Sequence, residues 1–241
     1  MVIARVLAPN PGPMTLDGTN TWVLPGGIVV DPGPLDEGHL GAVVEQVGRV
    51  ELTLVTHRHL DHTESLERFA ELAGCPVRAY DEQYCIGGPA LRDGERIDGW
   101  AVLHLPGHTD DSVAFLDETT GVLLSGDTIL GRGTAVIAYP DGALGPYLDS
   151  LRKLERLAAG GAIRTILPGH GPEIDQPHKV LSYYLEHRAE RLEQVRAARN
   201  AGAETPREVV ERVYADVDRS LWPAAELSVR AQLDYLNASG G

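Results

Sequence analysis

The segment THRHLDHT, residues 56–63, gathers four side chains that can bind a metal ion within six positions. They are His57, His59, Asp61 and His62. Imidazole nitrogens and carboxylate oxygens are ligands that borderline metals such as zinc prefer. The segment therefore predicts a metal site and raises the question of which other residues complete it.

Three further metal-capable residues each follow a stretch with the pattern of a strand. His108 follows WAVLHLPG, Asp127 follows GVLLSG and His170 follows RTILPG, just as His57 follows LTLVT. These stretches are short, rich in Val, Ile and Leu, and most are bounded by Gly or Pro, which is typical of strands that lead into loops. Such strand ends can converge on one edge of a sheet, so we expect these residues to meet.

The same motifs resemble the signature of the metallo-β-lactamase superfamily. THRHLDHT matches its H-x-H-x-D-H motif, and its later motifs are matched in order by PGHT (106–109), SGDT (125–128) and PGHG (168–171). The resemblance covers about residues 15–175. It implies an α/β fold, the αββα sandwich of that superfamily, with a dinuclear metal centre and a small C-terminal helical domain.

The resemblance also implies a role for each ligand. One metal would be held by His57, His59 and His108, the second by Asp61, His62 and His170, and Asp127 would bridge them. Two Zn²⁺ ions per chain, roughly 3.5–4 Å apart, would turn a shared water into a bridging hydroxide near neutral pH, which makes Asp61 and Asp127 the catalytic carboxylates. The charges of two zinc ions, two carboxylates and one hydroxide sum to about +1, which favours an anionic substrate or transition state.

Other stretches resemble one branch of that superfamily, the small β-lactamase-like proteins described as single-strand endoribonucleases. These stretches are GTNT (18–21), GHTDDS (107–112), ILGRGTAV (129–136) and the HR-x-x-R that begins at His187. The resemblance implies hydrolysis of single-stranded RNA by a candidate endoribonuclease. It also implies substrate-binding roles for Asn20, Thr21, His187 and Arg188.

Two other functions stay open. A glyoxalase II-like thioester hydrolase would share all seven ligands, but such enzymes usually bind glutathione through basic C-terminal residues in a pattern that is not matched here. A non-catalytic protein stabilised by metal is the alternative from another class, and the intact ligand set argues against it. A diiron oxygen reductase is disfavoured because those enzymes usually have Glu at the position of His59.

The chain divides by pattern into two parts. Over residues 1–178, short strand patterns often follow one another without a helix between them, which favours two sheets packed face to face with helices outside. Residues 179–241 contain no strand pattern and predict three helices, the second beginning at a capping box in Thr205-x-x-Glu208. We therefore expect a catalytic domain over 1–178 and a helical, winged-helix-like domain over 179–241.

The first C-terminal helix carries an arginine face. Its members lie within about 140° on a helical wheel and are Arg188, Arg191, Arg196 and Arg199. This face also contains apolar residues, so we expect it to dock on the main domain. Residues 1–178 hold 12 basic and 25 acidic residues, so ion pairing with that domain is one interpretation and phosphate binding near the metals is the other.

Charge and composition limit the partners. The formal net charge of −14 argues against specific or nonspecific duplex DNA binding, which needs clustered Lys and Arg. No apolar run approaches the roughly 18 residues that a membrane span needs. No signal-peptide pattern is visible, and Cys75 and Cys85 lie outside any metal-binding spacing, so we expect a cytoplasmic protein. The oligomeric state stays open, a homo-oligomer included.

Three other His and Asp residues are not expected to bind metal. His39 begins a helical pattern and is expected on the surface, and His104 is expected to adjoin the site without binding metal. Asp31 ends a strand pattern close to the expected site, and we expect it to fix loop amides.

Overall fold

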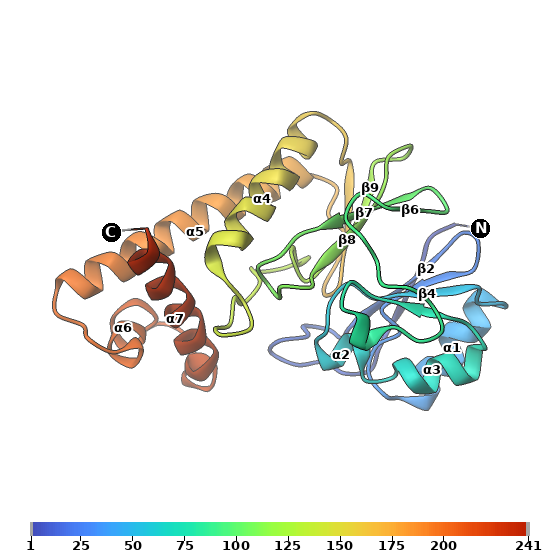
Figure 1. Ribbon diagram of the computed structural model, residues 1–241. Helices are drawn as coiled ribbons and strands as arrows, with labels where there is room; N and C mark the ends of the chain where they lie inside the picture. The colour runs from blue at the N-terminus through green and yellow to red at the C-terminus, as the bar shows by residue number, and fades with distance from the viewer. Residues whose placement is uncertain (1, 240–241) are drawn as a thin grey trace.

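Two five-stranded sheets lie at the centre of the computed structural model, which describes residues 2–239 (Figure 1). The first sheet contains, in spatial order, β1 (Ala4–Leu7), β2 (Asn20–Leu24), β3 (Ile28–Val30), β4 (Leu52–Leu54) and β5 (Val77–Arg78). The second contains, in spatial order, β10 (Thr165–Pro168), β9 (Val122–Gly126), β8 (Val113–Asp117), β7 (Trp100–His104) and β6 (Arg96–Ile97). The eight strands expected from pattern are confirmed, while β1 and β6 were not expected.

The helices surround these sheets and continue into the C-terminal part. Those near the first sheet are α1 (Glu37–Val47), α2 (Leu60–Thr63), α3 (Leu66–Ala73) and the 3-10 turn η1 (Glu82–Tyr84). The others are α4 (Leu144–Ala159), α5 (Pro177–Asn200), α6 (Pro206–Val213), η2 (Arg219–Leu221) and α7 (Trp222–Ala238). No helix in the described part of the chain is long and apolar enough to span a membrane.

The inner faces of the two sheets form one apolar layer. In β2, Trp22 and Leu24 pack in this layer, while Val23 between them belongs to a different cluster on the other face. This follows from the period of two along a strand, which sends successive side chains to opposite faces. Phe115 and Leu124 of the second sheet join Trp22 in the same layer, so the sheets pack face to face.

Helices cover both outer faces. Val23 and Val29 of the first sheet pack against Leu40 of α1 and Phe69 of α3. The second sheet packs its other face against α4 and α5 through a larger cluster that includes Leu116, Leu123, Tyr147, Leu151, Leu181 and Tyr184. The α/β fold and the αββα sandwich are therefore confirmed.

Strand direction brings the expected ligand loops to one edge. β3 pairs with β4 in parallel, and β9 with β10 in parallel, while β7 and β9 both run antiparallel to β8. The carboxyl ends of β7, β9 and β10 therefore lie on the same side of the second sheet. His108, Asp127 and His170 follow these ends, and His57 follows the end of β4.

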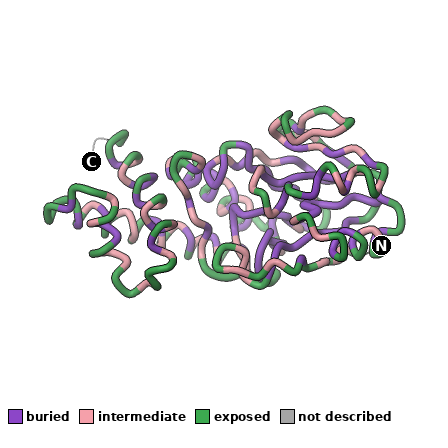
Figure 2. Tube along the Cα trace, turned by 90° about the horizontal axis from the view of Figure 1, so that it is seen from below, coloured by how far each residue is buried: buried purple, intermediate pink, exposed green. Residues whose placement is uncertain are grey.

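The C-terminal part is a small helical unit joined to the sandwich by α5 (Figure 1). Leu181 and Tyr184 in the first half of α5 belong to the core of the second sheet, whereas Val195 and Ala198 in its second half pack with α6 and α7. Figure 2 shows buried positions continuing along this connection. The capping box at Thr205 and Glu208 is confirmed.

The expected boundary between residues 178 and 179 falls inside the first turn of α5. A continuous helix offers no break there, because its backbone hydrogen bonds run through the position. Along α5, the core of the second sheet extends to Tyr184 and the core of the C-terminal helices includes Val195. The division of the chain into two domains stays a prediction.

Candidate metal centre

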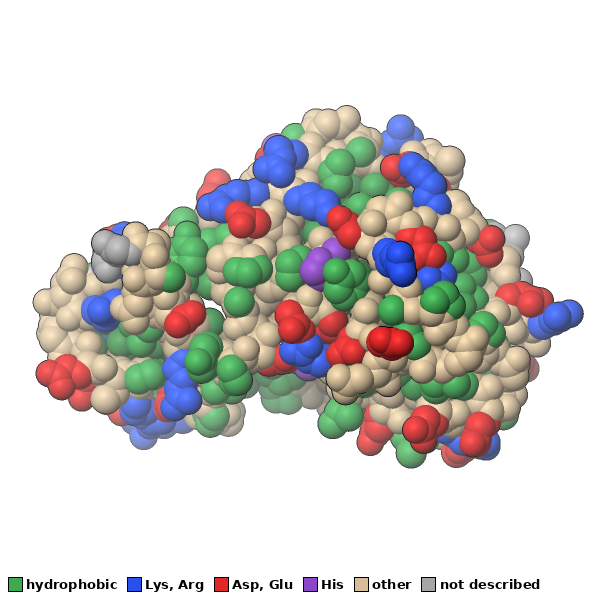
Figure 3. Space-filling view, viewed as in Figure 1, with side chains coloured by type: hydrophobic (Ala, Val, Ile, Leu, Met, Phe, Trp, Pro, Cys, Tyr) green, Lys and Arg blue, Asp and Glu red, His purple; other side chains and the backbone are tan. Residues whose placement is uncertain are grey.

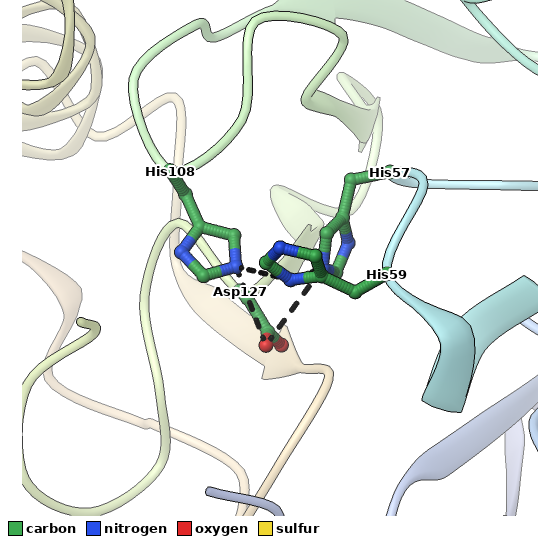
Figure 4. Close-up of side chains that lie close together, drawn as sticks. All are labelled: His57, His59, His108 and Asp127. Atoms are coloured by element: carbon green, nitrogen blue, oxygen red, sulfur yellow. Dashed lines mark hydrogen bonds and ion pairs between the residues drawn. The ribbon is translucent and has the colours of Figure 1, made fainter. Parts of the chain in front are cut away.

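Three histidines and an aspartate form a compact cluster at the edge described above. His57, His59, His108 and Asp127 each offer one ligand atom, and these atoms lie within 4.8 Å of one another. His59 Nδ1 is 3.1 Å from His57 Nε2 and 3.0 Å from His108 Nε2. Figure 4 shows the rings of His57 and His59, which share one loop, converging with His108 and Asp127 from other parts of the chain.

A second group of three ligands lies beside the first. Asp61, His62 and His170 also place their ligand atoms within 4.8 Å of one another. His62 Nε2 is 3.3 Å from His170 Nε2, and Asp61 Oδ2 is 3.1 Å from His170 Nε2. The structure thus divides the predicted ligands into the two sets that the resemblance implies.

Asp127 lies between the two groups. Its Oδ2 is 3.7 Å from His108 Nε2 and 3.2 Å from His170 Nε2, which belong to different groups. Its Oδ1 is buried and has no hydrogen-bond partner among the described residues. A buried carboxylate oxygen without a partner is costly in a folded protein, and a cation shared by the two groups would satisfy it.

The outward nitrogen of each histidine has an oxygen partner. These pairs are His57 Nδ1 with Thr56 Oγ1, His59 Nε2 with Asp141 Oδ2, His62 Nδ1 with Asp31 Oδ2, His108 Nδ1 with Val136 O and His170 Nδ1 with Gly18 O. Since carbonyl and carboxylate oxygens only accept, the histidines that face them must donate there. When these rings are neutral, their inward nitrogens present lone pairs, and metal-binding histidines are commonly oriented by outer partners in this way.

Ionisation differs between the two groups. Burial lowers the pKa of His108 to about 4, and burial together with His62 holds the pKa of His57 well below its ordinary value. Burial also acts on His62 and His170, but nearby carboxylates dominate and raise their pKa values to about 9 and about 11. In the metal-free protein the second group therefore holds protons that a divalent ion would have to displace.

The donor set fits two divalent ions. Each group supplies two or three imidazole nitrogens, and carboxylate oxygens complete it. His59 Nδ1 lies about 3 Å from both His57 Nε2 and His108 Nε2, so the lone pairs of the neutral rings would repel one another. An ion held there would remove this repulsion.

Asp31 positions the second group from behind. Its Oδ1 accepts from the Thr56 amide at 2.8 Å, and its Oδ2 accepts from Thr56 Oγ1 at 2.7 Å and from His62 Nδ1 at 2.8 Å. The expectation that Asp31 fixes a loop amide is confirmed. It also fixes the ring of a ligand, and it does so from a left-handed backbone conformation with φ of 54°.

Asp141 was not identified from sequence. It lies 82 positions from His59, accepts from His59 Nε2 at 2.9 Å and also pairs with Arg58. Asp110 binds the same Arg58 guanidinium, so the loop after β7 and the loop before α4 are joined behind the first ligand group. A lone Asp in TAVIAYPDGAL gives no local signal for this role.

Replacing Asp141 by Asn should weaken metal binding by the first group. The amide keeps one acceptor but loses the charge that orients His59 and increases its basicity, and loss of such outer partners costs roughly 10–100-fold in affinity. Titration of the metal-free protein with zinc in the presence of a chromophoric chelator measures this affinity. Asp149→Asn, which removes an exposed partner of Arg152, is the control, and equal affinities for both variants would contradict the role of Asp141.

The expected substrate residues near the N-terminus lie inside the fold. Asn20 and Thr21 are fully buried. Asn20 Nδ2 donates to Pro168 O and Gly171 O, and Thr21 Oγ1 donates to Asp31 O. In this structure they hold the His170 and Asp31 loops, and their contact with substrate stays a prediction.

The histidines His39 and His104 belong to neither ligand group. His39 is only 4% exposed and its Nε2 pairs with Thr21 Oγ1 at 2.9 Å, so the expectation of a surface position is wrong. The reason is that the side of α1 that carries His39 faces the first sheet. His104 stacks on Tyr80 and contacts Asp110 O, and it belongs to neither ligand group, as expected.

The arginine face of α5 docks on the main domain through Arg188 alone. Its other three members bond within α5 or to α6 and α7 in the described part of the chain, so the expectation that the whole face docks there is wrong. Arg188 donates to the backbone oxygen of Ala135, and Arg191 Nη1 donates to Gln194 Oε1 and Val213 O. Arg196 pairs with Glu193 of its own helix, and Arg199 donates to Asn237. Within residues 2–239 none of the four pairs with a carboxylate of the sandwich, because Arg188 meets a backbone oxygen there and the other three have their partners in the C-terminal helices.

Two family models match this chain. Residues 14–170 match the metallo-beta-lactamase superfamily, and residues 205–240 match the beta-lactamase associated winged helix domain. The first match contains all seven ligands of the two groups. The second lies within the C-terminal helical unit.

Relatives match the chain over most of its length. A beta-lactamase-like protein 2 homolog of Drosophila melanogaster is 33% identical over 279 residues, which cover 99% of this chain and 88% of the relative. An atrochrysone carboxyl ACP thioesterase of Aspergillus fumigatus is 31% identical over 208 residues, which cover 80% of this chain and 63% of the relative. The relatives therefore include both a beta-lactamase-like protein and a thioesterase.

Solved structures agree with the fold. A metallo-beta-lactamase family protein from Thermus thermophilus superposes with a TM-score of 0.79 at 25% identity, covering 99% of this chain and 94% of that one. A protein solved in a di-iron-bound form has a TM-score of 0.59 at 26% identity, covering 73% of this chain and 96% of that one. The likeness to the first extends over the C-terminal helices.

Proposed function

Because the chain belongs to the metallo-β-lactamase superfamily, we propose that it is a dinuclear zinc hydrolase that cleaves phosphodiester bonds of single-stranded RNA. The observation that carries the hydrolase proposal is the pair of ligand groups that meet at Asp127. All seven ligands are present, which argues against a non-catalytic binding protein. The histidine at position 59, where a redox diiron site would usually have Glu, favours zinc.

The ligand residues differ in their access to solvent. The side chains of His57, His62 and His170 are at most 1% exposed, while those of His59 and Asp61 are 35% and 27% exposed. Substrate therefore approaches on the side of His59 and Asp61. Two divalent ions held by these residues would polarise the scissile group and lower the pKa of a water molecule.

A cavity of about 180 Å³ adjoins the ligands. The ligands His108 and Asp127 line it together with residues that bind no metal in either group, among them Met14, Leu130 and Thr134. Asp61 Oδ2, outside this cavity, accepts from Thr19 Oγ1 at 3.2 Å, which orients the carboxylate on the open side. The geometry suits a substrate that extends from the ligands toward the C-terminal helices.

The charge of the metal centre and several sequence motifs support RNA as the substrate. A centre with net positive charge favours a phosphodiester over a neutral ester, and the GTNT, GHTDDS and HR-x-x-R stretches resemble the endoribonuclease branch. Positive and negative side chains are interspersed over the face in Figure 3, which suits local recognition of a short single strand better than tracking along a duplex.

A thioester hydrolase is the second candidate. Two relatives of this chain are named acyl carrier protein thioesterases. The cavity beside Asp127 is also lined by apolar side chains, among them Pro13, Met14, Leu16 and Leu130, which would suit an acyl chain. Carrier-bound thioesters also contain a phosphodiester in their pantetheine arm, so both candidates are anionic.

A substrate panel separates these candidates. The zinc-loaded protein is assayed with fluorescein-labelled single-stranded RNA, S-lactoylglutathione, an acyl-pantetheine thioester, a nitrophenyl phosphodiester and nitrocefin. We expect RNA cleavage to exceed lactam and thioester hydrolysis, and to disappear with a chelator. Asp61→Asn, purified in the same way, is the control that excludes a contaminating nuclease. Rapid thioester turnover without RNA cleavage at the same metal content would reverse the ranking.

A further inference from the structure

A second, larger cavity lies between the sandwich and the C-terminal helices. Its volume is about 470 Å³, within the range of small-molecule sites. We call it the Arg188 cavity; its walls include Met14, residues 133–136, His187, Arg188, Arg191 and Tyr214. Apolar residues of the C-terminal unit, such as Val217 and Leu221, also line it.

Arg188 is an unusual residue for this position. It is 8% exposed, and it is the one arginine or lysine that is buried among residues 2–239. Its Nη2 donates to Ala135 O and its guanidinium lies 5.2 Å from the centre of the Tyr147 ring, but its Nε has no partner among these residues. No carboxylate in the described part of the chain forms an ion pair with it. A buried cation without a counter-charge is unfavourable, and an anion bound in the cavity would supply one.

Two neighbours contribute further polar groups. His187 Nδ1 is buried and lacks a partner within the described chain. Arg191 lies over the Tyr214 ring at 4.8 Å and also makes no ion pair with the described residues. Burial and the two neighbouring guanidiniums lower the pKa of His187, which indicates a positive local potential.

A short loop separates this cavity from the metal centre. Pro13, Met14 and residues 133–136 line both cavities. The carbonyl of Ala135 accepts from Arg188, and the carbonyl of the next residue, Val136, is 3.0 Å from Nδ1 of the metal ligand His108. A ligand that crosses this loop would contact the Arg188 cavity at one end and the metal centre at the other.

From this arrangement we propose that the Arg188 cavity binds a phosphate group of the substrate that is distinct from the bond being cleaved. The inference rests on the proposed hydrolase function and extends it to recognition of the substrate's length. The guanidinium nitrogens of Arg188 and Arg191 donate to the phosphate oxygens, and the apolar side holds the base or the pantetheine arm attached to it. The same phosphate chemistry occurs in RNA and in a carrier-bound thioester.

The test compares phosphorylated with unphosphorylated probes on the zinc-loaded protein. The pairs are adenosine with adenosine 5′-monophosphate, and pantetheine with 4′-phosphopantetheine, and binding is measured by calorimetry. We expect the wild-type protein to prefer the phosphorylated member of at least one pair. In Arg188→Met this preference should fall about tenfold to a hundredfold, because charge-assisted hydrogen bonds are lost, and metal content should not change.

Two further variants distinguish loss of phosphate binding from a general effect on the fold. Arg196→Met removes an arginine of the same helix that pairs with Glu193 and should retain the full preference. Arg191→Gln, at a half-buried position, serves if Arg188→Met does not fold, and should reduce the preference in the same direction. The proposal is overturned if the wild type prefers neither phosphorylated probe, or if the Arg188 and Arg191 variants keep the wild-type preference.

The RNA proposal is tested apart from this one by the substrate panel. Arg188-dependent preference for 4′-phosphopantetheine alone, with no RNA cleavage, would retain the cavity proposal and reject RNA as the substrate. RNA cleavage without any Arg188-dependent phosphate preference would retain RNA as the substrate and reject the cavity proposal.

Discussion

Replacing Asp127 by Asn is expected to reduce turnover at least about a hundredfold while leaving the fold intact. The amide has nearly the same volume as the carboxylate, but its neutral oxygen holds two cations poorly. The wild-type protein should contain close to two zinc ions per chain by elemental analysis, and the variant should contain fewer. Circular dichroism should show the same helix and strand content for both.

Asp111→Asn provides the control for this variant. Asp111 is also buried near the site and accepts from Thr109 Oγ1 at 2.6 Å, but it belongs to neither ligand group. Because it offers no ligand atom to either group, loss of its charge should cost little metal. Near-wild-type turnover and metal content in Asp127→Asn would show that Asp127 does not bridge the two groups.

Replacing Gly169 by Ala should also inactivate the protein, for a steric reason. The added Cβ would overlap Asp127 Oδ1 and lie 2.9 Å from His62 Cε1. The backbone cannot move away easily, because Gly169 N donates to Gly126 O at 2.9 Å and Gly169 O accepts from Asn20 N at 2.7 Å. Displacement of a catalytic group by about 1 Å can cost about a hundredfold in rate.

Gly41→Ala is the matched control for this variant. Gly41 lies in α1, and a Cβ there would meet no atom within 4 Å. The control should be neutral or slightly stabilising, since Ala is favoured over Gly in helices by about 1 kcal/mol. Turnover rates and zinc content are compared for the two variants, and wild-type values in Gly169→Ala would contradict the steric argument.

The local elements were predictable because their signals lie within a few residues. β2 to β5 and β7 to β10 combine β-branched residues with Gly and Pro boundaries, and the capping box at Thr205 marks the start of α6. β1 and β6 were missed because both lie at the edges of their sheets, where short strands with exposed positions carry a weaker pattern.

The burial of single side chains was harder to predict. His39 is buried because the first sheet, with Thr21 and Gly33, covers its side of α1. Arg188 is buried where the segment 133–136 meets α5 and Ala135 O accepts its hydrogen bond. Neither covering segment lies close enough in sequence for a local pattern to reveal it.

The sequence by itself determined the types and order of the ligands, because a metal site needs particular donor atoms and each of these follows a recognisable strand. Only the tertiary structure decided which residues form hydrogen bonds to the ligands and which residues surround Arg188. Asp141 reaches His59 across 82 positions, and Ala135 reaches Arg188 across 53. Such contacts depend on how the sheets stack and how α5 crosses them, and these are properties of the packed chain that no short segment encodes.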